Sequence, residues 1–166
     1  MKEDVYTQYK NAAAEFSGLI SLFGEKEINT IPFDGSWTAA QVVAHVLKSN
    51  KSIVQALNMK AEAADRPPDE RVEELKAIFL NFKIKLKSPD FILPEPGIYK
   101  KETLAGDLNK SIEELKTVSR KVNLSGTIHH TAFGDITRLE LMHFVVYHTQ
   151  RHSNQLKKMV ELVKNM

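Results

Sequence analysis

The chain has 166 residues, of which 42% are hydrophobic and 27% are charged, and its 23 basic and 21 acidic side chains leave a net charge of +2. This balance is typical of a soluble globular protein, and the length suits one domain covering residues 1–166. The small, evenly mixed charge argues against nucleic-acid binding, and the absence of cysteine excludes disulfides, thiolate metal ligands and a cysteine nucleophile.

The N-terminal residues lack the apolar segment of a signal peptide, and no apolar run approaches the length needed to cross a membrane. We therefore expect a cytoplasmic protein that does not contact a membrane. Helical periodicity runs through most of the chain and strand alternation is almost absent, which indicates an all-α fold.

A first helix is predicted from Val5 to Phe23, where apolar residues recur at helical spacing. Gly24 follows the last apolar position and is interpreted as the C-terminal cap of this helix. The segment 31–35 contains Pro32 and an Asp-Gly pair, which together predict a turn.

A second helix is predicted from Trp37 to Met59, capped by Ser36 or Thr38, with Gln41 in the capping-box position relative to Thr38. Its first half is apolar on most faces, which is typical of a helix buried on several sides. His45 is the titratable residue inside this apolar run. A lone histidine in such a place is more often a hydrogen-bonded core residue than a metal ligand, so its meaning depends on other histidines.

The section from Ala61 to Lys101 is interpreted as a long crossover that contains one helix. The apolar stripe from Val72 to Leu86 predicts that helix, and Ser88-Pro89 should end it. Pro94 to Gly97 indicates an extended loop. The crossover is no domain linker, because several of its apolar side chains need burial: Phe79, Phe82, Phe91 and Ile92.

A further helix is predicted between Leu104 and Val122, followed by a loop from Thr127 to Asp135. His129 and His130 lie in this loop, and we expect them to be exposed to solvent or to stand behind a site without contacting it. Asp135 or Thr137 should cap the last helix.

The last helix carries polar residues in the middle of its apolar seam. The seam follows a spacing of four and three residues through Leu141, Val145, His148, His152, Gln155, Met159 and Leu162. His148 and His152 point the same way, about 40° apart around the helix axis. Burying them is costly without partners, so they are either hydrogen-bonded core residues or metal ligands. His143 lies off the seam and is expected at the surface or at an interface.

Four long helices around one core, with an additional helix in the crossover, bring a third histidine within reach of this pair. Helical bundles build metal sites from side chains on facing helices, and His45, His148 and His152 fit that design. Neutral imidazoles suit zinc, nickel, iron or copper better than calcium or magnesium. The three leave at least one position open, as in catalytic zinc sites. The site is not that of a His-Glu-x-x-His metalloprotease, because Thr149 occupies the place of the glutamate.

Two stretches of the sequence resemble the DinB-like superfamily. Residues 37–46 are similar to its W-[ST]-x-x-x-x-x-x-H-[LV] signature, and Phe133 to Thr137 together with residues 148–156 resemble its closing F-G-x-[LI]-T and H-x-x-R-H-x-x-Q-[LI] pattern. Residues 88–94 also resemble the crossover of one branch. The resemblance implies an antiparallel four-helix bundle with a long crossover, often a homodimer, that holds a divalent metal through three histidines, here His45, His148 and His152.

Characterised members of that superfamily include metal-dependent transferases of low-molecular-weight thiols and a thiol-dependent maleylpyruvate isomerase. The resemblance therefore implies a divalent transition metal (zinc, nickel or iron), a small-molecule substrate and an external thiol, because the chain has no cysteine. The alternatives are a hydrolase that uses metal-activated water, and a non-catalytic metal-binding or dimerisation bundle. A homodimer is also favoured by the apolar residues of the crossover, although burial within one chain competes with this interpretation.

Three residues border the histidine seam and are candidates for orienting substrate or ligands: Arg151, Tyr147 and Gln155. For Arg151 a structural role, in a salt bridge or as a cap, is the stronger interpretation.

Overall fold

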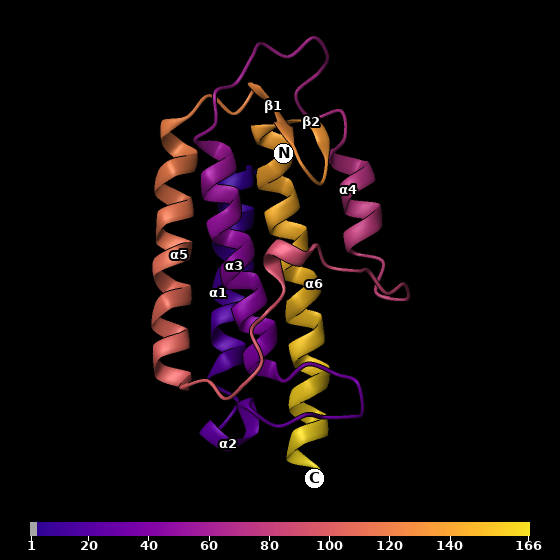
Figure 1. Cartoon of the computed structure of the whole chain (residues 1–166). Helices are drawn as coiled ribbons and strands as arrows, with labels where there is room; N and C mark the ends of the chain where they lie inside the picture. The colour runs from indigo at the N-terminus through magenta and orange to yellow at the C-terminus, as the bar shows by residue number, and fades with distance from the viewer. Residues whose placement is uncertain (1–2) are drawn as a thin grey trace.

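Four long helices lie side by side in the computed structural model, which describes residues 3–166 (Figure 1). They are α1 (Val5–Ile20), α3 (Ala39–Leu57), α5 (Lys101–Lys121) and α6 (Arg138–Lys164). The remaining elements are short: α2 (Glu25–Ile28), α4 (Val72–Phe79), the 3-10 helix η1 (Asp90–Ile92), β1 (Thr127–His130) and β2 (Gly134–Thr137). The predicted four-helix bundle with a long crossover and an extra helix is confirmed.

The crossover determines the direction of the third long helix. In Figure 1, α1 and α6 descend whereas α3 and α5 ascend, so α3 and α5 run in the same direction. Two consecutive long helices that run in the same direction need a long connection between them. Residues 58–100, which include α4 and η1, form this connection and return the chain to the lower end of the bundle. Of the described helices, none is long and apolar enough to cross a membrane.

Capping boxes set the starts of the two helices that carry the histidines. Thr38 accepts from the Gln41 N–H at the start of α3, and the Gln41 side chain accepts from the Thr38 N–H. Thr137 and Glu140 make the same reciprocal pair at the start of α6. Thr38 and Thr137 are thus the caps, in preference to the alternatives Ser36 and Asp135. At the start of each of these helices, two backbone N–H groups that have no partner within the helix are thus hydrogen-bonded.

The first half of α3 is buried on several sides, as predicted, and six of its apolar residues are at most 5% exposed: Ala39, Ala40, Val42, Val43, Ala44 and Val46. The seam of α6 is buried from Leu141 to His152 and again at Met159, whereas Gln155 is half-buried. Leu162 is exposed, and Val163 is buried in its place. The apolar stripe follows the 3.6-residue turn of a straight helix here, so a strict heptad drifts off the core.

The ends of two predicted helices differ from the structure. Helix α1 ends at Ile20, and Gly24 is the N-cap of the short α2 instead of the C-cap of α1. Helix α4 ends at Phe79, well before Leu86. Beyond Phe79 the Arg151 guanidinium donates to three crossover carbonyls, those of Phe79, Asn81 and Ile84. Because these carbonyls turn towards Arg151, the segment after α4 leaves the helical path.

Burial of the crossover is also less complete than predicted. Ile92 is buried and Phe79 packs against the core in part, but Phe82 and Phe91 are exposed. In Figure 1 the crossover passes in front of α6, and η1 lies over the space between α3 and α6.

The segment from Thr127 to Asp135 was predicted as a loop, and the structure shows an antiparallel hairpin instead. Thr127 pairs with Thr137, Ile128 with Ile136, His129 with Asp135 and His130 with Gly134. Gly134 has φ of 68°, in the left-handed region that glycine tolerates best. Side chains alternate across a strand, so Ile128 and His130 are buried while His129 is exposed.

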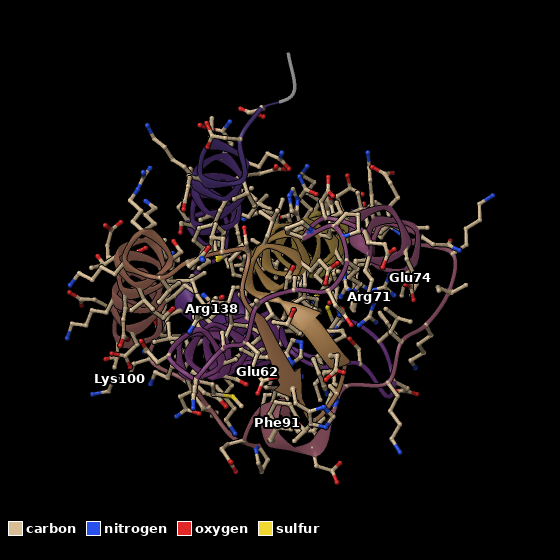
Figure 2. The ribbon with its side chains drawn as sticks, turned by 90° about the horizontal axis from the view of Figure 1, so that it is seen from above. Glu62, Arg71, Glu74, Phe91, Lys100 and Arg138 are labelled. Atoms are coloured by element: carbon tan, nitrogen blue, oxygen red, sulfur yellow. The ribbon has the colours of Figure 1, made fainter. Side chains whose placement is uncertain are left out.

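A buried ion pair fixes this hairpin and α4 to the start of α6. The Glu140 carboxylate is fully buried and accepts from both terminal nitrogens of Arg66, at 2.6 and 2.9 Å, and from the Arg71 backbone N–H at 2.9 Å. The Arg71 guanidinium in turn donates to the carbonyls of Phe133 and Asp135. Viewed down the bundle, Arg71 lies between the hairpin and α4 (Figure 2).

Replacing Glu140 with alanine should lower the free energy of unfolding by about 3–5 kcal/mol, because it leaves Arg66 and two backbone donors, the N–H groups of Arg71 and Thr137, without their acceptor. Glu70→Ala is the matched control, since Glu70 is an exposed partner of the same Arg66, 3.5 Å away. It should cost less than about 1 kcal/mol. Urea unfolding of both variants measures the difference, and equal losses would contradict the role assigned to Glu140.

Candidate metal centre

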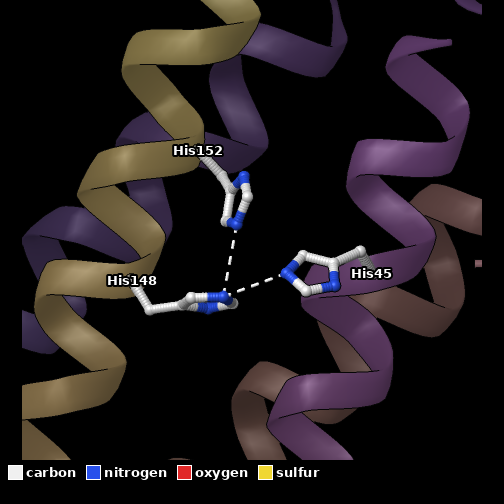
Figure 3. A group of neighbouring side chains, drawn as sticks. All are labelled: His45, His148 and His152. Atoms are coloured by element: carbon white, nitrogen blue, oxygen red, sulfur yellow. Dashed lines mark hydrogen bonds between the residues drawn. The ribbon is translucent and has the colours of Figure 1, made fainter. Parts of the chain in front are cut away.

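Three imidazoles meet between α3 and α6 (Figure 3). His45 comes from α3, and His148 and His152 come from successive turns of α6. The Nε2 atom of His148 lies 3.0 Å from Nε2 of His45 and 3.2 Å from Nε2 of His152. All three side chains are buried, and one ring nitrogen from each lies within 4.8 Å of the others.

The outer nitrogens of two rings are held by oxygen acceptors. Nδ1 of His45 lies 2.8 Å from the carbonyl oxygen of Ile92, and Nδ1 of His152 lies 2.8 Å from Oε1 of Gln155. A carbonyl oxygen can only accept, so both Nδ1 atoms carry the proton. The lone pairs of Nε2 then face the centre of the cluster, which is the tautomer that metal-binding histidines use.

Hydrogen bonds among the rings cannot account for both short contacts. With His45 and His152 protonated on Nδ1, only His148 can place a proton between the rings, and one proton on its Nε2 serves one contact. In the other contact, the lone pair of the partner ring would face a nitrogen whose single proton points elsewhere. A cation at the centre would instead take a lone pair from each of the three Nε2 atoms. Tetrahedral zinc with Zn–N bonds of about 2.0–2.1 Å separates its nitrogen ligands by about 3.3 Å, close to the two distances between His148 and its neighbours.

Burial keeps the three rings neutral. It lowers the pKa of His45, lowers the pKa of His152 to about 3 with a further contribution from His45, and lowers the pKa of His148 well below its usual value. Desolvation penalises the protonated form in each case. At neutral pH the cluster therefore offers three neutral imidazoles, the form in which histidine binds metal.

A cavity of about 260 Å³ opens beside the cluster, and all three histidines line it. Its walls come from α3, α4, α6, the crossover and the hairpin, and most are apolar: Ile53, Ile78, Phe79, Leu86, Phe91, Ile92, Phe133 and Phe144. Among the described residues, no aspartate or glutamate lines this cavity. An ion held by the histidines would thus face a largely apolar space.

A second cavity, of about 460 Å³, lies on the other side of the crossover segment 86–88. Arg151 and His152 line both cavities. The second one is more cationic, because Lys85 and Lys158 line it in addition to Lys87, which lines both cavities, against one acidic residue, Asp90. Two unlike spaces therefore reach His152.

The three candidate orienting residues lie in different surroundings. Gln155 contacts the cluster directly through His152. The Arg151 guanidinium caps the end of α4 and holds the crossover through its three carbonyl bonds, which agrees with the capping interpretation. The Tyr147 hydroxyl lies 3.5 Å from Nδ1 of His143, with the two rings stacked, and Tyr147 lines neither cavity. His143 is half-buried.

His130 was expected to be exposed or behind a site, and this was wrong: it is 8% exposed and lines the apolar cavity. His129 is 80% exposed and pairs with Asp135 on the surface, as expected. The alternation Ile128-His129-His130 opposite Ile136 was the available signal for the inward direction of His130. This signal is weak because the strand has only four residues.

Comparisons with known proteins agree with this fold. The sequence profile of the DinB superfamily matches residues 8–156. No curated protein matches the chain in sequence. Among solved structures, TT2238, described as a four-helix bundle protein, is similar with a TM-score of 0.61 and 16% identity over 93% of this chain and 96% of its own. YfiT from Bacillus subtilis, described as a probable metal-dependent hydrolase with an unusual four-helix bundle topology, has a TM-score of 0.59 and 17% identity over 95% and 84%.

Without metal, the chain should lose stability as the pH falls from 7.5 to 5.5. The unfolded chain takes up protons on its histidines near pH 6.5, whereas the buried cluster stays neutral down to about pH 3 at His152. The free energy of unfolding therefore has its full value above pH 6.5. Below pH 6.5 it decreases, by at most about 1.4 kcal/mol per pH unit for each buried histidine.

Urea unfolding in the presence of a chelator measures this dependence. His152→Gln should reduce the slope, and His129→Gln, which changes an exposed histidine, should leave it unchanged. Equal stability of the original protein at pH 7.5 and 5.5 would contradict a neutral, buried cluster.

Proposed function

Because the chain belongs to the DinB superfamily, we propose that it is a divalent-metal-dependent enzyme whose ion is held by His45, His148 and His152. The observation that carries the proposal is the convergence of three neutral imidazoles, with Nε2 lone pairs directed inward, on the wall of a cavity. A purely structural site would have no need of that cavity.

The donor set narrows the choice of ion. Three imidazole nitrogens favour zinc, nickel or iron over calcium and magnesium, which prefer oxygen. Among the described residues, no fourth histidine, cysteine, aspartate or glutamate joins the cluster, and this supports an open position over a closed structural site. An ion bound there would lower the pKa of a water or thiol ligand and so supply a nucleophile at neutral pH.

The leading activity is transfer of a low-molecular-weight thiol to a small apolar substrate. The chain has no cysteine, so the thiol must come from outside. A free thiol has a pKa of about 8.5 against about 15.7 for water, so it needs less help from a general base, and no carboxylate of the described residues lines the apolar cavity. The lysines of the second cavity suit the carboxylates that many small thiols carry.

Hydrolysis by activated water is the second candidate, and the fold similarity to YfiT, described as a probable metal-dependent hydrolase, supports it. A hydrolase would use the same three histidines but would not need the cationic cavity. A non-catalytic metal-binding or dimerisation bundle would use neither cavity.

The homodimer stays a prediction. Phe82, Phe91 and Ile98 of the crossover are exposed, Ile98 to 90%, and a second chain would cover apolar surface of this kind. Sedimentation of the 18.8 kDa chain distinguishes monomer from dimer.

Untagged protein should bind one transition-metal ion per chain, and His148→Ala or His152→Ala should abolish binding while the far-UV helical signal persists. His129→Ala is the matched control, because it removes an exposed histidine outside the cluster. Elemental analysis after incubation with excess zinc or nickel and desalting gives the stoichiometry. Finding no bound metal in the original protein would refute the proposal.

Cobalt-substituted protein should develop a sulfur-to-metal charge-transfer band when a low-molecular-weight thiol is added. Ionising the thiol releases a proton, so this band should strengthen as the pH rises towards the pKa of the thiol. Lys85→Gln with Lys158→Gln should weaken the response to a thiol that carries carboxylates and leave the response to 2-mercaptoethanol unchanged. An unchanged cobalt spectrum with every thiol would leave hydrolysis as the enzymatic proposal.

A further inference from the structure

His130 is a buried polar residue of the apolar cavity that the proposed metal chemistry leaves unused. It is the last residue of β1 and lines the same cavity as the three histidines of the cluster. Its Nδ1 accepts a hydrogen bond from the Ala132 backbone N–H at 3.0 Å. The hairpin thus holds the ring in place from one side.

This hydrogen bond determines what the other ring nitrogen does. Because the Nδ1 lone pair is occupied, the proton of the neutral ring is on Nε2, which is then a donor. Burial lowers the pKa of His130, so the ring stays neutral at neutral pH. Among the described residues, none forms a hydrogen bond with Nε2 of His130. Nε2 is not one of the described side-chain atoms that are both fully buried and unpartnered, so it is accessible from the cavity, where a ligand oxygen could accept its hydrogen bond.

Two phenylalanine rings connect His130 to the metal cluster. The His130 ring centroid lies 5.1 Å from that of Phe133, Phe133 lies 4.9 Å from Phe144, and Phe144 lies 5.0 Å from His148. These rings form one wall of the cavity. A ligand that reaches both ends must therefore lie along an aromatic surface, which favours an apolar or aromatic body.

We propose that His130 is a substrate-binding residue whose Nε2–H donates to a carbonyl oxygen of the substrate, while the apolar body of the substrate packs on Phe133 and Phe144. This assignment rests on the proposed function for the reacting end of the substrate, which lies at the histidine cluster. The site takes small apolar carbonyl compounds, such as ketones, esters or amides. A neutral donor beside the Phe133 ring suits an uncharged carbonyl, because burying a carboxylate there would cost far more desolvation.

The competing interpretation is that His130 serves only to hold the Ala132 N–H. Two substitutions separate the roles. Asparagine at 130 keeps an acceptor near the Nδ1 position but has no donor near Nε2, whereas glutamine can place its amide N–H near the Nε2 position. A purely structural residue would be better replaced by asparagine than by glutamine.

The test uses metal-free protein, so its result does not depend on metal binding. Nitrogen-15 NMR of the imidazoles should show His130 protonated on Nε2, and titration with acetophenone should shift that Nε2–H. Toluene, which lacks the oxygen, should leave it unshifted. His130→Asn should weaken acetophenone binding roughly three- to tenfold, the factor that one net hydrogen bond supplies. His130→Gln should keep affinity within about twofold, and toluene should bind all three proteins equally.

His129→Asn is the matched control on the solvent side of the same strand, and it should bind acetophenone like the original protein. The proposal is overturned if His130 carries its proton on Nδ1, or if acetophenone gives no shift up to its solubility limit. It is also overturned if the His130→Asn and His130→Gln variants bind acetophenone alike, or if benzoate binds more tightly than acetophenone. Failure of the metal proposal would appear separately, as absent metal in the elemental analysis.

Discussion

The dominant constraint on this structure is that three buried, neutral imidazoles carry too few protons to bridge their two short contacts. Burying polar groups costs free energy unless each finds a partner, and one proton on His148 can serve only one of its two close contacts. Two Nδ1 anchors, the Ile92 carbonyl and the Gln155 side chain, prevent His45 and His152 from turning away. The cluster therefore has the geometry that a cation needs before any cation binds. The unpaired lone pair lowers the free energy of unfolding of the metal-free protein.

The crossover links this constraint to the cavities. Its 3-10 helix supplies the carbonyl of Ile92 to His45, and Arg151, one residue before His152, holds the segment after α4 through three carbonyls. The same crossover divides the apolar space from the cationic one. The hairpin lines the upper end of the apolar cavity. Hydrogen bonds hold it to the start of α6, since Arg66 and Arg71 donate to Glu140 and the Arg71 guanidinium donates to the carbonyl of Phe133. Access to the apolar cavity, the orientation of His45 and stability at the top of the bundle thus depend on segments that lie outside the four long helices.

How much the sequence predicts depends on how local the determinant is. Helical spacing predicts α3 and α6 almost to their ends, because capping boxes at Thr38 and Thr137 are signals within four residues. The same spacing predicts that His45, His148 and His152 face one core. The end of α4 is not predictable in this way, since it is set by hydrogen bonds from Arg151, about 70 residues later in the chain. The hairpin is also not predictable from the sequence, because strands of four residues show too little alternation of apolar and polar residues. The inward position of His130 is therefore not predictable either.

A metal centre with an open face, formed by these three histidines, is what we propose for this bundle. The most direct test is a crystal structure of protein loaded with zinc, with anomalous diffraction recorded at the zinc edge. We expect one strong peak at about 2.0–2.1 Å from Nε2 of His45, His148 and His152, with the remaining ligand coming from solvent in the apolar cavity. A peak that contacts fewer than three of these nitrogens, or a fourth protein ligand that closes the coordination sphere, would contradict it.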